Sequence, residues 1–285
     1  MTPDPGSPHP TLDLPLDEGR VRIRTIGDGP FLLCLHGVSA QGRSWMAVAR
    51  LLAPLVRVVI PDLLSRGAST PRADIAYGLE DEVRRVREIV DRLELRPPVV
   101  VAGHSHGAAL ALAYARAEPG VRGLVLSNPV NPWTRRPIAL SLLRSDLVRA
   151  AASRAGGLAT ERLARAILRR ASGPDFTVTP EDVGAYAAPY REPLRRRALL
   201  RVLSDWRPGE LADRLPDRSL VTRIFAGDQD PRITIGSVER LAGALDARLT
   251  RVPDGGHILP EQHPRMLARE IIEVLREVGE LDGTC

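Results

Sequence analysis

The strongest constraint on the fold is a glycine-flanked serine between a predicted strand and a predicted helix. The pentapeptide GHSHG at 103–107 follows the apolar run 98–102 and precedes the alanine-rich stretch 108–117. A turn this sharp needs glycine on both sides, because strand and helix pass too closely for a Cβ and the serine is forced into strained backbone angles. The strain would lift the Ser105 hydroxyl into a cleft, which makes Ser105 our candidate nucleophile.

A serine nucleophile needs an acid and a histidine, and both follow later in the chain. A predicted buried strand over 220–226 runs into a loop that carries Asp230. A second predicted strand, 248–252, leads into a glycine-rich loop that carries His257. We take Asp230 as the acid and His257 as the base, because hydroxyl, carboxylate and imidazole then each follow a strand in the order Ser, Asp, His.

Together these motifs resemble the α/β-hydrolase superfamily, in its capped esterase and C–C-bond hydrolase branch. The resemblance spans about residues 20–280 and includes HGV at 36–38 after the apolar run 31–35, similar to the family's dipeptide that turns backbone amides toward an oxyanion. PDLLSRGAS at 61–69 is similar to the family's PDLxGxGxS loop, except that Ser65 stands where glycine is usual. That departure affects the shape of the loop rather than the fold.

The resemblance implies a serine hydrolase that forms an acyl-enzyme. His257, held in one tautomer by Asp230, would take the proton of Ser105 and then protonate the leaving group. Backbone N–H groups of Val38 and His106 would hold the oxyanion, the second at the N-terminus of the helix after the serine. The favoured function is hydrolysis of a small-molecule carboxylic ester, with no cofactor.

Other functions stay open on the same motifs. Hydrolysis of a C–C bond in a diketone-like substrate uses the same Ser, Asp and His, and a lyase, a cyclase or a ligand receptor could also carry them. Haloalkane dehalogenases and epoxide hydrolases of the superfamily carry an aspartate at the position of Ser105, which argues against both.

Two residues near the predicted strand ends compete with Asp230 for the role of the acid. Asp228 could serve or could merely close the turn, and we favour Asp230 because the family places its acid next to the last position of this turn. Asn128 occupies a position where some relatives carry their acid, but an amide cannot supply the charge.

Five further side chains are candidates for the substrate pocket, each with a packing alternative. For His36 we favour a structural role, in which its ring bonds the loop backbone. For His104, a pocket role and a structural role are equally favoured. For the aromatic residues, core packing is at least as common. The five are His36, His104, Trp133, Tyr186 and Trp206.

The rest of the chain predicts an α/β core interrupted by an insertion. We expect a flexible lead over 1–11 and a core over 12–130 and 209–285, in which strands and helices alternate, so the central sheet should be mostly parallel and flanked by helices. Between them, 131–208 shows only helical periodicity. We interpret it as a helical cap over the active site, with a dimer interface or plain packing as the alternatives.

Composition narrows the partners and cofactors. All 40 basic residues are arginine, which excludes a pyridoxal Schiff base and a P-loop lysine. The net charge is +5, but 35 acidic residues are interleaved and only 4% of the chain is aromatic, so we expect no nucleic-acid partner. The only closely spaced histidines flank Ser105, so we expect no metal.

Features of the chain that bear on its location favour the cytoplasm. Cys34 and Cys285 do not suggest a disulfide framework, and the first ten residues lack the charged and apolar regions of a signal peptide. No apolar run approaches the roughly 20 residues that span a bilayer. We therefore expect a soluble, cytoplasmic protein with no membrane partner.

Overall fold

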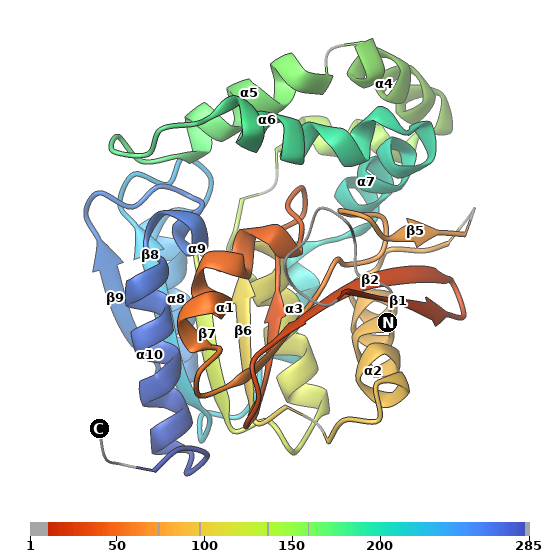
Figure 1. Cartoon of the computed structure of the whole chain (residues 1–285). Coiled ribbons are helices and arrows are strands. Elements are labelled where there is room, and N and C mark those ends of the chain that lie inside the picture. Colours follow the sequence, from red (N-terminus) through yellow and green to blue (C-terminus); the bar gives the residue numbers. More distant parts are fainter. Residues whose placement is uncertain (1–10, 73–74, 97, 136, 159, 283–285) are drawn as a thin grey trace.

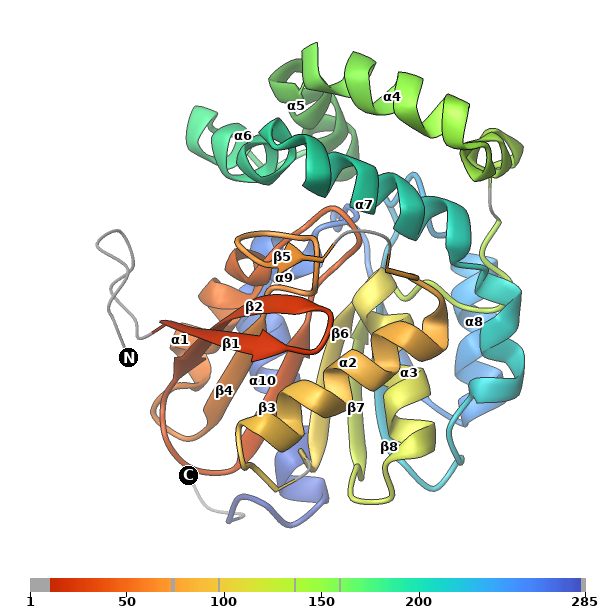
Figure 2. The same ribbon diagram turned by 90° about the vertical axis from the view of Figure 1, so that its right-hand side faces the viewer.

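The computed structural model describes residues 11–72, 75–96, 98–135, 137–158 and 160–282. The chain forms a central sheet with helices on both faces and a separate helical layer above one end of the strands (Figures 1 and 2). The expected flexible lead lies outside the described residues except for Thr11. That residue belongs to the first described strand.

Within the described residues the sheet has nine strands, and most of them run parallel. The five pairings that link β4 to β9 are parallel, whereas the three pairings of β2 are antiparallel. This confirms the mostly parallel sheet predicted from the alternation of strands and helices. In spatial order the strands are β1 (Thr11–Leu16), β2 (Gly19–Ile26), β4 (Arg57–Pro61), β3 (Phe31–Leu35), β6 (Val100–His104), β7 (Gly123–Ser127), β8 (Val221–Gly227) and β9 (Arg248–Val252), and β5 (Thr70–Pro71) pairs with β2.

Each face of the sheet has its own hydrophobic core, because successive side chains of a strand point to opposite faces. In β3, Leu33 and Leu35 pack into one core, while Leu32 and Cys34 pack into the other. The first core lies under α2 (Leu79–Arg92), α3 (His106–Ala117) and α8 (Ile235–Leu245). The second lies under α1 (Met46–Leu52), α9 (Leu259–Gln262) and α10 (Pro264–Glu277), and the short 3-10 helix η1 (Gly42–Trp45) precedes α1.

The chain between β7 and β8 forms the helical layer, which lies above the C-terminal ends of the parallel strands (Figure 1). No strand interrupts it within the described residues. From η2 to α7 the layer consists of the 3-10 helices η2 (Ile138–Arg144) and η3 (Ala188–Arg191) and the α-helices α4 (Asp146–Leu158), α5 (Thr160–Ala171), α6 (Pro180–Ala187) and α7 (Pro193–Asp205). The 3-10 helix η4 (Pro208–Arg214) then leads back to the sheet and packs against α3.

Polar contacts hold the helical layer against loops of the core. The Gln41 side chain donates to the carbonyl oxygen of Ala185 in α6 at 2.9 Å. From α7, the Arg195 guanidinium donates to the Gly67 carbonyl oxygen at 2.8 Å. The layer is therefore positioned by the loops that leave the sheet at the same edge.

The cysteines and the apolar helices bear on the predicted location of the protein. Cys34 is buried and carries a free thiol, and Cys285 lies outside the described residues. Within the described part of the chain, no helix combines the length and the apolar character that crossing a membrane requires.

Candidate active site

Ser105 stands at the turn between β6 and α3 in a strained conformation. Its φ is 53° and its ψ is −116°, a combination that residues other than glycine rarely adopt. A Cβ at Gly103 would meet the Ala108 Cα at 2.5 Å, and one at Gly107 would meet the Leu35 carbonyl oxygen at 2.2 Å. Only glycine therefore fits on either side of the serine, as the sequence predicts.

The structure brings the three predicted catalytic side chains into one hydrogen-bonded series. The Ser105 hydroxyl donates to His257 Nε2 at 3.0 Å, and His257 Nδ1 donates to Asp230 Oδ2 at 2.7 Å. The other Asp230 oxygen accepts from the backbone N–H groups of Arg232 at 2.7 Å and Ile233 at 3.1 Å. Asp230 is thus fixed by its own loop and in turn fixes the imidazole tautomer that leaves Nε2 free to accept.

Asp228, the competing acid, faces the other way. Its Oδ1 accepts from the Arg251 guanidinium at 2.9 Å in a partly exposed ion pair. It forms no contact with His257 among the described hydrogen bonds and ion pairs, whereas Asp230 does.

Asn128 joins the two loops that carry the acid and the histidine. Its amide nitrogen donates to the carbonyl oxygens of Gly256 at 2.9 Å and His257 at 2.8 Å, and its amide oxygen accepts from the Gly227 N–H at 2.9 Å. From the sequence, Asn128 stood at a position where some relatives carry their acid, but with an amide that cannot supply the charge. The structure gives it a positioning role that needs an amide, because it donates and accepts at once.

The backbone amides proposed for the oxyanion lie beside the serine. A Cβ placed on Gly37 would lie 3.4 Å from the Ser105 Cβ, and Val38 lines the same cavity as Ser105. His106 is the first residue of α3, where helix amides lack intrahelical partners. Neither the Val38 N–H nor the His106 N–H is bonded to any residue that the structure describes. Both amides are therefore available to a ligand.

A buried ion pair contacts both of these residues. Arg66 is fully buried and pairs with the buried Glu82, and its Nε donates to the Val38 carbonyl oxygen at 3.3 Å. His106 Nε2 donates to the second Glu82 oxygen at 2.5 Å. Burial alone would raise the pKa of Glu82, but Arg66 and His106 hold it below its usual range. The pair thus links the two sides of the proposed oxyanion site.

Sequence reasoning missed this ion pair, although a signal was present. Glu82 lies in the apolar stripe of α2, next to Val83 and one turn before Val86, and a carboxylate there is buried. Arg66 belongs to the 61–69 motif but was given no role. A charged residue within an apolar helical stripe predicts a buried partner of opposite charge.

The two remaining histidine candidates differ. His36 donates from Nδ1 to the Gly37 carbonyl oxygen at 2.8 Å and accepts at Nε2 from the Leu63 N–H at 2.9 Å. Burial lowers the pKa of His36 to about 4. It lines neither described cavity that contains Ser105, and both ring nitrogens are bonded to loop backbone, which agrees with the structural role favoured for it. His104 does line one, and burial lowers its pKa well below the usual value.

Two cavities open onto both Ser105 and His257. The narrow cavity has a volume of about 30 Å³, and the wide cavity has about 560 Å³. A third, the helical-layer cavity, has about 150 Å³ and lies among apolar side chains of α4, α5 and α7. Ser39, Ile167 and Tyr186 line both it and the narrow cavity, so the two adjoin.

The three aromatic candidates differ in which cavity they line. Tyr186 lines the narrow and helical-layer cavities. Trp206 lines the wide cavity. Its ring contacts the His106 ring edge to face, with the ring centroids 4.9 Å apart. Trp133 lines no described cavity, since the Arg240 guanidinium covers its ring at 4.7 Å from the centroid. Trp133 is partly buried against the first core, which agrees with the packing alternative.

Tyr186 also contacts a carboxylate that the sequence analysis did not single out. Its hydroxyl donates to Glu261 Oε1, behind the narrow cavity. Burial raises the pKa of Glu261 to about 7, although the Tyr186 hydrogen bond opposes the shift. The only sequence signal was a position just after the His257 loop, which we expected to begin a helix.

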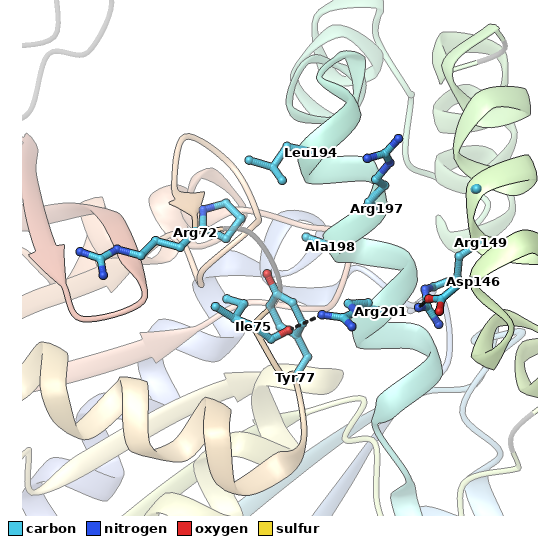
Figure 3. Close-up of a pocket in the computed structure, with 11 residues that line it drawn as sticks. Arg72, Ile75, Tyr77, Asp146, Arg149, Leu194, Arg197, Ala198 and Arg201 are labelled. Atoms are coloured by element: carbon cyan, nitrogen blue, oxygen red, sulfur yellow. Dashed lines mark hydrogen bonds and ion pairs between the residues drawn. The ribbon is translucent and has the colours of Figure 1, made fainter.

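A fourth cavity, of about 430 Å³, lies between α7, α4 and the loop after β5, away from Ser105 (Figure 3). Its guanidinium groups do not converge: those of Arg72 and Arg197 point away from each other, and Arg201 donates to the Ile75 carbonyl oxygen at 3.0 Å. We assign no ligand to it. Among the described residues, no three His, Cys, Asp or Glu side chains lie together as metal ligands would.

A family model places the chain among known proteins. The model of the alpha/beta hydrolase family matches residues 32–270. The chain belongs to the alpha/beta hydrolase family. The matched segment of this family member includes Ser105, Asp230 and His257, and the fold agrees with it.

Relatives of this alpha/beta hydrolase carry different names. It is 28% identical over 248 residues to a Magnesium-chelatase 30 kDa subunit of Rhodobacter capsulatus, with 82% of each chain covered. It is 28% identical over 287 residues to a haloalkane dehalogenase of Mesorhizobium japonicum, covering 92% of this chain and 90% of that protein. A solved alpha/beta hydrolase fold protein from Burkholderia ambifaria superposes with a TM-score of 0.80 at 25% identity, covering 93% of this chain and 99% of that one. The family supports a hydrolase, while these names leave the substrate open.

Proposed function

We propose that the chain is a capped serine esterase, which cleaves carboxylic esters through Ser105, His257 and Asp230. The observation that carries the proposal is the hydrogen-bonded series from the Ser105 hydroxyl to His257 at 3.0 Å and from His257 to Asp230 at 2.7 Å. A base within hydrogen-bond distance of a nucleophile, itself oriented by a carboxylate, is the arrangement that activates a serine.

Each group has one role in the reaction. As the Ser105 oxygen attacks the acyl carbonyl carbon, His257 Nε2 takes the hydroxyl proton, and Asp230 stabilises the imidazolium that results. The tetrahedral intermediate collapses, His257 gives the proton to the alcohol oxygen, and the alcohol leaves the acyl-enzyme. Water then attacks the acyl carbon with His257 again as base, which releases the acid and restores the Ser105 hydroxyl.

The oxyanion would bind the N–H groups of Val38 and His106. Both amides are free within the described structure, and that of His106 lies at the positive end of the α3 dipole. Each such donor contributes about 3 to 4 kcal/mol to transition-state stabilisation.

Ser105 favours acyl transfer over the reaction named for the dehalogenase relative. Displacing a halide directly calls for a carboxylate nucleophile, and the haloalkane dehalogenases of the superfamily carry an aspartate at the position of Ser105. A serine paired with His257 is instead suited to attack at a carbonyl carbon.

The cavities suggest how an ester would lie. We assign the acyl chain to the narrow cavity and the adjoining helical-layer cavity, whose walls include Leu163, Ala164 and Leu199. A cavity of 150 Å³ can hold a benzene molecule, so it fits a chain of about six carbons. The alcohol portion would then occupy the wide cavity. In this arrangement the helical layer acts as a cap that forms the roof of the acyl site.

Hydrolysis of a p-nitrophenyl ester series from acetate to decanoate, at pH 8, tests the proposal. We expect Ser105→Ala to lower turnover by up to about a millionfold. Ser39→Ala, in the wall of the narrow cavity, is the matched control and should change turnover far less. Turnover that survives Ser105→Ala would contradict the proposal. So would a folded wild type that cleaves diketone-like C–C bonds but no ester.

A further inference from the structure

Two guanidinium groups stand out in the wall of the wide cavity. Arg232, from the loop after β8, and Arg135, from the segment after β7, both line it. The described lining contains no Asp or Glu, and most of it is apolar. Arg232 also lines the narrow cavity, so it borders the space around Ser105 on both sides.

Asp230 does not neutralise the Arg232 guanidinium by direct contact, although it is only two residues away. One of its oxygens accepts from His257, and the other accepts from the backbone N–H groups of Arg232 and Ile233. The structure records no hydrogen bond or ion pair from the Arg232 side chain to any described residue. The carboxylate therefore binds the backbone of Arg232 and leaves its guanidinium free.

Arg232 and Arg135 are both exposed, and neighbouring protein atoms partly desolvate the Arg232 guanidinium. Desolvation by the protein lowers the pKa of Arg232, the Asp230 charge opposes this, and the Arg170 charge adds to it. Arg135 likewise has no ion pair or hydrogen bond within the described structure. By contrast, several arginines elsewhere are paired, as Arg251 is with Asp228 at 2.9 Å. Two unpaired guanidinium groups in a cavity without described acids are therefore available to an anion that enters it.

We propose that Arg232 and Arg135 form a carboxylate-binding subsite, so that the ester substrate carries a carboxylate besides the bond that is cleaved. This rests on the proposed ester hydrolysis. A guanidinium binds a carboxylate through two parallel hydrogen bonds, and the apolar walls would hold the hydrocarbon part of the substrate. The subsite would select for amphiphilic, negatively charged esters.

Matched pairs of charged and neutral esters test the subsite. 4-Carboxyphenyl butyrate against phenyl butyrate places the charge on the alcohol portion, and mono-4-nitrophenyl glutarate against 4-nitrophenyl valerate places it on the acyl portion. We expect wild type to prefer the charged member of one pair by about 10-fold to 100-fold in kcat/KM, mainly through KM. Arg232→Gln should bring that ratio close to one, and Arg135→Gln should reduce it. Arg218→Gln removes an exposed charge that lines no described cavity and should preserve it.

Two outcomes would overturn the subsite while leaving the esterase proposal intact. One is equal Ser105-dependent hydrolysis of both members of both pairs, and the other is a charge preference that survives Arg232→Gln. Added NaCl should weaken the preference, since salt screens the charges.

Binding without turnover separates the two proposals. In a Ser105→Ala background, we expect calorimetry to show tighter binding of 4-propylbenzoate than of 4-propylbenzamide. Adding Arg232→Gln should weaken the benzoate about tenfold or more. Charge-selective binding of this kind together with no ester turnover would retain the carboxylate subsite and overturn the esterase. Equal binding of both ligands would overturn the subsite.

Discussion

Asp228 and Asp230 lie two residues apart in one loop, and their hydrogen bonds give them different roles. Asp230 accepts from His257, while Asp228 accepts from Arg251 at the surface. We expect Asp230→Asn to lower kcat by about 10⁴-fold, because an amide can stabilise the wrong imidazole tautomer. Asp228→Asn is the matched control and should alter kcat and stability little, since exposed ion pairs contribute little. Steady-state kinetics with the preferred p-nitrophenyl ester measure both; comparable losses would contradict the assignment of the acid.

The Arg66–Glu82 pair predicts a stability effect at a single residue. Glu82→Gln leaves the buried Arg66 charge without a carboxylate, and breaking a buried ion pair in this way costs about 3 to 5 kcal/mol. Glu80→Gln, on the exposed face of the same helix, removes only a surface pair with Arg214 and should cost well under 1 kcal/mol. Urea unfolding at pH 7.5 measures both. A Glu82→Gln protein as stable as Glu80→Gln would show that the buried charge is not required.

The same residues mark how far the candidate site could be predicted from the sequence. Ser105, Asp230 and His257 were predictable because each follows a strand, and parallel strands bring their C-terminal ends to one edge. The contact between Arg66 and Glu82 was not, because it joins a loop to a helix face whose rotation only packing determines. The free guanidinium of Arg232 was equally hidden, since exposed and unpaired arginines look alike in a sequence.

At the scale of elements, apolar runs predicted the core strands closely. The apolar run 31–35 and the strand expected over 248–252 coincide with β3 and β9, and the strand expected over 220–226 lies one residue before β8. β1 (Thr11–Leu16) was not expected, although its leucines alternate, because a short edge strand that contains Pro15 gives a weak signal. Helical periodicity located the layer between β7 and β8, but its placement above the sheet follows from contacts such as that between Gln41 and Ala185.

Helix α5 forms part of the wall that should limit the length of the acyl chain. Ala164 faces the helical-layer cavity, whereas Ala166 on the same helix is exposed. Ala164→Phe should fill much of the 150 Å³ cavity and move the optimum of the p-nitrophenyl series from about six carbons to shorter chains. The expected signature is a loss of kcat/KM for hexanoate that exceeds the loss for acetate.

Ala166→Phe adds the same side chain outside the cavity and should leave the chain-length profile as in wild type. An unchanged profile for Ala164→Phe, in a variant that folds, would mean that the acyl chain lies elsewhere. A profile that changes equally in both variants would point to a general effect on α5.

Across the whole molecule, the helical layer and the core meet at the histidine loop. The His257 N–H donates to the carbonyl oxygen of Ala171 at the end of α5, at 2.5 Å. A Cβ at Gly256 would meet the Gly173 nitrogen at 2.4 Å, so the histidine loop and the segment after α5 are in direct backbone contact. The layer therefore roofs the cavities and also supports the proposed base, and loosening it should affect catalysis as well as substrate choice.

Glu261 makes this contact region sensitive to pH. Burial raises its pKa from an ordinary value of 4.5 to about 7 in the folded protein. An acid whose pKa is raised by folding contributes its full stability below pH 4.5 and loses it as the pH rises to about 7, because ionisation then favours the unfolded chain. The shift corresponds to at most about 3 kcal/mol. Glu261→Gln should remove this dependence while keeping an oxygen that accepts from the Tyr186 hydroxyl.

Urea unfolding of wild type and Glu261→Gln from pH 4.5 to 8 tests this linkage. Relative to wild type, the variant should gain stability steadily up to about pH 7, and the gap should then level off. The difference between the two proteins cancels the titration of other groups, including His36, whose pKa burial lowers to about 4. Glu239→Gln, at an exposed position on α8, controls for the loss of one negative charge and should show a smaller gap without this slope. A gap that stays constant over this range would show that Glu261 ionises alike in the folded and unfolded chains.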